Sequence, residues 1–65
     1  MDTKVIKLLG KHDFYYNPED NTIETLDHTK VMLLRDDKVE PLEAFTGLRY
    51  TDKVHLINIL DNGHN

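Results

Sequence analysis

Four histidines are the first residues whose side chains could hold a metal ion or transfer a proton: His12, His28, His55 and His64. No two of them have the His-x-His or His-x-x-x-His spacing that places two imidazoles on one face of a strand or helix. The chain has no cysteine, so a thiolate zinc site is excluded. We therefore predict surface histidines and no metal site. A zinc site assembled from distant parts of the fold is the alternative.

Adjacent carboxylates are the second candidates for chemistry, at Glu19-Asp20 and Asp36-Asp37. On a strand, two neighbouring side chains point to opposite faces. In a tight turn, acidic side chains more often bond to the backbone. Paired catalytic acids also need a cleft, which 65 residues hardly enclose. The chain lacks serine as well, so we predict that it is not an enzyme and takes no cofactor.

Binding sites for calcium, phosphate groups or nucleic acid find little support in the sequence. The segment 17–24 offers oxygen ligands, but it lacks the mid-loop glycine and the flanking helices of a calcium loop. The three glycines stand alone, so no glycine-rich phosphate loop exists. Lys4, Lys7 and Lys11 are too few for the basic patch that neutralises a phosphate backbone. We expect no direct nucleic-acid binding.

Acidic residues are concentrated in one stretch of the chain. The net charge is −4, and the segment 13–27 has five acids and no lysine or arginine. On a hairpin, carboxylates about 6–7 Å apart along a strand and about 5 Å apart across strands would approximate rows of phosphates. Such a surface would attract a basic DNA-binding protein. Its simplest alternative is a solubilising surface. The predicted partner-binding residues are Asp13, Glu19, Asp20, Glu24, Asp27, Asp36 and Asp37.

A family resemblance favours the same function. The run 31–34, followed by Asp36-Asp37, Gly47-Leu48 and Asp52, resembles the central strand and downstream segment of small phage-encoded uracil-DNA glycosylase inhibitors. The resemblance covers about a third of the chain and implies an acidic protein that imitates DNA. The Glu-Ser-Ile motif of one inhibitor group is absent, since the chain has no serine. What the resemblance implies is therefore the broader group of acidic phage host-takeover proteins, which act on nucleoid proteins, RNA polymerase or nucleases.

The size of the chain suggests one domain, residues 1–65, with little stability to spare. Domains of this length bury only about 60% of the surface of the unfolded chain. Without disulfides or a metal, homodimerisation is the most direct way to bury more apolar surface. No apolar run approaches the ~20 residues of a membrane span, and residues 1–4 lack the features of a signal peptide. We expect a cytoplasmic protein.

Four strands are predicted in the first half of the chain. The first strand is predicted at Val5–Leu9 and ends at Gly10. The next two form a predicted hairpin, with strands at Phe14–Tyr16 and Thr22–Leu26 and a turn at 17–21. Within the hairpin, Ile23 and Thr25 share one face and Glu24 and Leu26 the other. Lys30–Arg35 is the fourth strand, and a turn follows at Asp36-Asp37.

The last third of the sequence is more helical. Pro41 suits the start of a helix and Gly47 its end, with Leu42, Phe45 and Leu48 on one face. A second helix over 51–62, capped by Thr51, is favoured over a strand. The predicted fold is a small α+β two-layer domain of about four antiparallel strands followed by one or two C-terminal helices.

The charge distribution and the apolar spacing lead to two functional hypotheses. The first is a non-catalytic acidic inhibitor that competes with DNA for a basic host protein, with a histone-like nucleoid protein as the first target and a DNA-repair glycosylase or another DNA-binding protein as the next. The second is an oligomeric adaptor that binds a protein partner through an apolar patch at Leu42, Phe45, Leu48 and Tyr50. Salt distinguishes them, because charge-led binding weakens as ionic strength rises.

Overall fold

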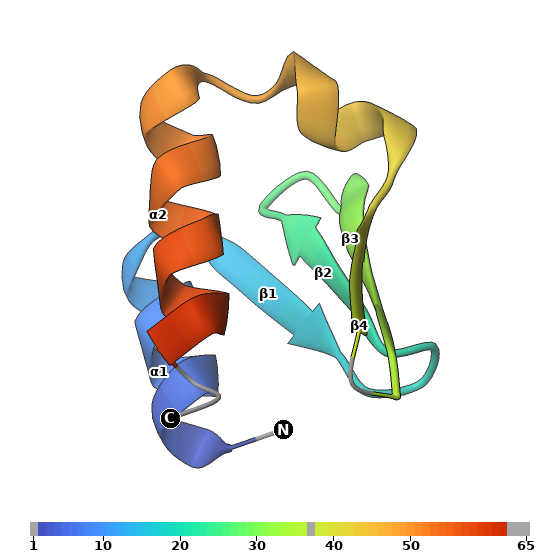
Figure 1. Cartoon of the computed structure of the whole chain (residues 1–65), viewed down its shortest axis with the longest axis vertical. Coiled ribbons are helices and arrows are strands. Elements are labelled where there is room, and N and C mark those ends of the chain that lie inside the picture. The colour runs from blue at the N-terminus through green and yellow to red at the C-terminus, as the bar shows by residue number, and fades with distance from the viewer. Residues whose placement is uncertain (1, 37, 63–65) are drawn as a thin grey trace.

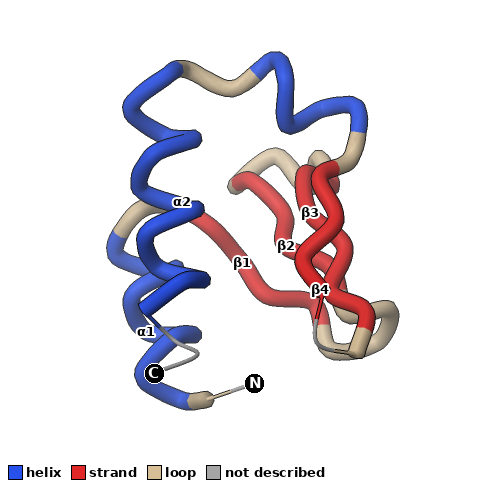
Figure 2. Tube along the Cα trace, in the orientation of Figure 1, coloured by secondary structure: helices blue, strands red, loops and turns tan. Residues whose placement is uncertain are grey.

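The computed structural model describes residues 2–36 and 38–62 as two layers, a four-stranded antiparallel sheet and the helices that pack on it. Figure 1 shows helices α1 (Thr3–Lys11) and α2 (Tyr50–Asn62) side by side, and the 3-10 helix η1 (Glu43–Gly47) passing over one end of the sheet. The strands follow in order, β1 (Phe14–Asn17), β2 (Thr22–Thr25), β3 (Lys30–Arg35) and β4 (Lys38–Pro41) (Figure 2). The predicted α+β class is confirmed.

The core lies between one sheet face and the helices. Fully buried side chains come from α1, the sheet and α2, namely Leu9, Ile23, Val31 and Leu56. Phe14 and Met32 complete the sheet side of this cluster, and Ile59 and Leu60 complete the α2 side. An irregularity in the β2–β3 pairing sets Ile23 opposite Met32 and Glu24 opposite Lys30, so Val31 is the extra residue of a bulge. Val31 and Met32 are neighbours, yet both are buried.

The predicted strand at Val5–Leu9 is wrong, because these residues lie within α1. Asp2 caps the helix: its carboxylate accepts a hydrogen bond from the Lys4 backbone N–H at 2.9 Å. Val5 and Leu9, four residues apart, form the buried stripe of the helix. Gly10 does not end the element, since the helix continues through Lys11.

The hairpin over 13–26 and the strand Lys30–Arg35 are confirmed. The predicted helix from Pro41 to Gly47 is wrong in its first part, where Pro41 ends the edge strand β4. The helical turn begins after Leu42 and is a 3-10 helix. Phe45 of this helix and Leu48, which follows it, pack against the core, whereas Leu42 is the extended residue that precedes the helix. Residues 51–62 are helical, and Thr51 lies inside α2 rather than capping it.

Candidate functional site

The exposed acidic residues of the predicted surface lie at two opposite ends of the sheet. The pairing of Phe14 with Thr25 places Asp13 and Asp27 at one end. The β1–β2 and β3–β4 turns meet at the other end, where the Leu34 N–H donates to the Asn21 carbonyl at 2.8 Å (Figure 1). Glu19, Asp20 and Asp36 therefore lie together there. Asp37 lies outside the described residues.

Glu24 does not belong to an exposed acidic surface, contrary to the prediction. Glu24 is only 4% exposed. It lies on the sheet face opposite the helices, between Tyr15 of β1 and Lys30 of β3. The Asn17 side-chain amide donates to one carboxylate oxygen at 2.8 Å, and His28 Nδ1 lies 3.3 Å from the other. These partners compensate for the loss of water, so Glu24 has a structural role.

Asp20 is held by neighbouring strands rather than left free for a partner. Its carboxylate forms an ion pair with the Lys30 ammonium and accepts a hydrogen bond from the Thr22 hydroxyl at 2.6 Å. Lys30 above all, and then Thr22, lower the pKa of Asp20 below its ordinary 3.8, and the pairing raises the pKa of Lys30. This ion pair joins the β1–β2 turn to β3.

The Asp20 ion pair predicts a specific pH dependence. The pKa of Asp20 is lower in the folded chain than in the unfolded one, so its contribution to stability is present above about pH 4 and is lost as the pH falls through the folded pKa. We expect Asp20→Asn to flatten the acid limb of the stability curve, measured by urea unfolding between about pH 2 and 6. Lys30→Met removes the main cause of the lowered Asp20 pKa and should also make stability less dependent on pH in this range. If the free energy of unfolding of both variants fell with pH as steeply as that of the wild type, this role of the ion pair would be contradicted.

Four chain reversals use polar residues in the left-handed backbone region, with φ of 65° at Asp13, 55° at Asn21, 67° at His28 and 48° at Asp36. They stand between α1 and β1 and in each of the three strand connections. Asn, Asp and His tolerate this conformation better than other residues with a Cβ. Part of the acidity of this sequence therefore serves the backbone.

Asp36 allows this backbone role to be separated from charge. We expect Asp36→Val to lower the free energy of unfolding by about 1–2 kcal/mol, because a β-branched residue is strained at this φ. Asp36→Gly removes the same carboxylate but should change stability by only a few tenths of a kcal/mol. Urea unfolding at one protein concentration measures both. Equal losses in the two variants would instead assign the effect to the carboxylate.

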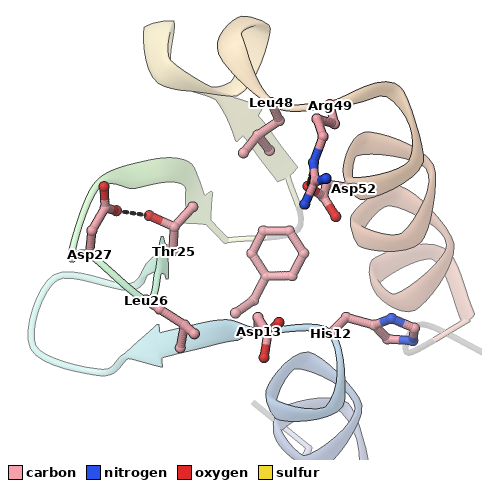
Figure 3. A pocket seen from close by; sticks show the side chains of 9 residues that line it. His12, Asp13, Thr25, Leu26, Asp27, Leu48, Arg49 and Asp52 are labelled. Atoms are coloured by element: carbon pink, nitrogen blue, oxygen red, sulfur yellow. Dashed lines mark hydrogen bonds and ion pairs between the residues drawn. The ribbon is translucent and has the colours of Figure 1, made fainter.

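A depression of about 380 Å³ lies at the end of the sheet that carries Asp13 and Asp27. Figure 3 shows four segments around it: His12 and Asp13 from the α1–β1 connection, Leu26 and Asp27 from the β2–β3 turn, Leu48 and Arg49 before α2, and Asp52 on α2. Phe14 and Thr25 complete the lining. This acidic pocket, as we call it, thus combines three carboxylates with the apolar side chains of Phe14, Leu26 and Leu48.

The carboxylates of the acidic pocket differ in their surroundings. Asp27 accepts hydrogen bonds from the Thr25 hydroxyl and the Thr29 N–H, and these contacts, the Thr25 hydroxyl first, lower its pKa. Asp52 lies 3.5 Å from Arg49, whose side chain is 88% exposed. Asp13 forms no hydrogen bond or ion pair with the side chains of residues 2–36 and 38–61. Asp13 and Asp27 therefore form no ion pair with a described side chain, although Arg49 lines the same pocket.

Asp13 and Asp27 were predicted from the sequence, whereas Arg49 and Asp52 were missed as parts of the same site. Asp52 is recognisable in the sequence only as an acid in the first turn of a helix, where it interacts favourably with the helix dipole. Arg49 carries no local signal. The proximity of both to Asp13 depends on the packing of α2 beside α1, which no local pattern encodes.

The described histidines and the residues of the predicted apolar patch are divided among several parts of the structure, and His12 and Leu48 line the acidic pocket. His64 lies outside the described residues. The His12 and His55 rings lie 4.4 Å apart between α1 and α2, but the described residues contain no cluster of three metal-ligating side chains. Phe45 and Leu48 pack against the core, whereas Tyr50 is 80% exposed. Among the described helices, none has the length and apolar character needed to cross a membrane.

In comparisons with known proteins, no family model, no curated protein and no solved structure matches the chain significantly. Its function must therefore be argued from the acidic pocket and the surfaces around it.

Proposed function

We propose that this chain is a non-catalytic binding protein whose acidic pocket receives a lysine or arginine side chain of a basic, DNA-binding host protein. The observation that supports this is the lining of the pocket, which is shared by Asp13 and Asp27 and the apolar side chains of Phe14 and Leu48. Lysine and arginine have the matching form, an apolar stem with a cationic head.

Competition with DNA is the proposed consequence. DNA-binding proteins use lysine and arginine to neutralise phosphates, so a basic side chain held in the acidic pocket is withdrawn from DNA. The net charge of −4 adds long-range attraction to a basic partner. The inhibitor would thus imitate DNA through one acidic end of its sheet rather than through rows of acids along a hairpin. A histone-like nucleoid protein is the proposed first target, in the cytoplasm of a host cell.

The test is binding of the immobilised chain to a purified histone-like nucleoid protein at about 50 mM and about 300 mM salt, with duplex DNA as competitor. The proposal expects an association rate that falls steeply with salt and a complex that DNA displaces. No binding at the lower salt concentration would reject this target. Binding that survives salt and DNA would favour the second candidate, an apolar adaptor, for which the supporting observation is the exposed Tyr50, two residues after Leu48 in the sequence.

A further inference from the structure

The outer edge of β4 carries a self-complementary sequence. β4 is the last strand of the sheet, and among the described residues it pairs with β3 alone. Its centre reads Lys38, Val39, Glu40, with opposite charges on either side of one apolar residue. Lys38 and Glu40 are exposed, and a hollow of about 610 Å³ lies along them. From this edge we infer that two copies of the chain pair through β4 in an antiparallel arrangement centred on Val39.

The backbone of β4 presents hydrogen-bonding groups to such a partner. The Leu42 N–H donates to the Val31 carbonyl at 2.9 Å, so position 42 faces β3. Alternate residues of an edge strand face in and out, and positions 39 and 41 therefore face away from the sheet. Val39 offers both its N–H and its carbonyl outward. The proline at position 41 costs no ladder hydrogen bond, because its missing N–H would point outward.

Charge selects one register among the antiparallel pairings. With Val39 opposite Val39 of the second copy, Lys38 lies opposite Glu40 in both symmetric positions, and opposite charges attract across strands. A register in which Val39 faces Pro41 sets Glu40 against Glu40. A shift of the same size the other way sets Lys38 against Lys38. Charged residues on an edge strand usually prevent pairing with another strand. Here they disfavour the two shifted registers and favour the one centred on Val39.

An apolar groove beside β4 gives the pairing additional surface to bury. The groove, of about 250 Å³, runs between α2 and β4 and is lined by Met32, Val39, Pro41, Phe45, Ile57, Leu60 and Asp61. Ile57 is 44% exposed there. Residues directly opposite on paired strands share a face, so the two grooves come to lie on the same side of one continuous sheet. The small contact area indicates a dissociation constant on the order of micromolar.

The pairing does not depend on the proposed function, since the acidic pocket contains no β4 residue. Its test is sedimentation equilibrium of the full chain, with circular dichroism to verify folding. The wild type should approach twice its 7.6 kDa mass as concentration rises. Lys38→Glu and Glu40→Lys should each weaken association about tenfold, because each places like charges opposite each other.

The complementary combinations make the test specific to this register. An equimolar mixture of Lys38→Glu and Glu40→Lys chains should dimerise, as should the double variant, because opposite charges then face each other again. Val39→Pro removes the outward N–H and should leave a folded monomer. A monomeric wild type at about 1 mM, a thousand times the expected dissociation constant, would overturn the inference. A dimer that persists in folded Val39→Pro, or mixtures that fail to associate, would overturn it too.

Discussion

Replacing Leu56 by alanine is expected to remove most of the free energy of unfolding of the protein at 25 °C. Leu56 is fully buried in the core cluster, and Leu9 of α1 is fully buried in the same cluster. Removal of a buried leucine costs about 2–5 kcal/mol, from lost burial and from the cavity left behind. A single core of this size supplies only about 3–5 kcal/mol of net stability. The loss therefore equals most of the stability of the domain.

Urea unfolding followed by circular dichroism measures the effect at one fixed protein concentration, since association would add to the apparent stability. Leu26→Ala is the matched control. Leu26 is 69% exposed, so the same truncation should change the free energy of unfolding by less than about 0.5 kcal/mol. A loss below about 1 kcal/mol for Leu56→Ala would mean that α2 contributes little to the core.

Neutralising Asp13 and Asp27 together is expected to slow association with the histone-like nucleoid protein about tenfold and to reduce its dependence on salt. These two carboxylates border the acidic pocket and form no ion pair with a described side chain. At position 13, asparagine tolerates the left-handed backbone conformation that Asp13 adopts. At position 27, the amide oxygen of asparagine can still accept the hydrogen bond from the Thr29 N–H. Folding should therefore be retained, and stopped-flow or biosensor association rates report the charge effect alone.

The control removes the same two charges from the other end of the sheet, at Glu19 and Asp36. Glu19→Gln with Asp36→Asn changes the net charge equally, so a contribution from overall charge would slow both double variants alike. Equal slowing would remove the acidic pocket from the proposal and leave only a generally acidic protein.

Arg49→Ala is expected to speed association with the same nucleoid protein, because it leaves Asp52 without its cation. Its association rate is measured in the same way.

Patterns within a few residues were sufficient for the hairpin, for β3 and for α2. Proline and asparagine in the segment 17–21 mark a turn between two short β-prone runs, and the residues that pair are only 5 to 11 positions apart in the sequence. The apolar stripe of α2 depends only on helical periodicity. These elements also determine which end of the sheet each hairpin acid occupies, once the register is known.

Two elements were not predictable because their local patterns are ambiguous. Residues 3–11 satisfy both a strand and a helix pattern, and the Asp2 cap together with the contact between α1 and α2 decides for the helix. β4 contains one apolar residue in four, too few for a strand pattern. It is a strand because β3 offers a free edge to it, a condition that exists only in the folded chain.

The amino-acid sequence by itself determined the charge, the lack of a thiolate site, the hairpin and the helical character of the C-terminal segment, because each depends on composition or on contacts between near neighbours. Only the tertiary structure decided which acids matter together. It buried Glu24 beneath its neighbours on a sheet face, paired Asp20 with Lys30, and joined Asp13, Asp27 and Asp52 around one depression. Such groupings depend on register and on how helices pack, and these arise from long-range contacts that no local spacing records.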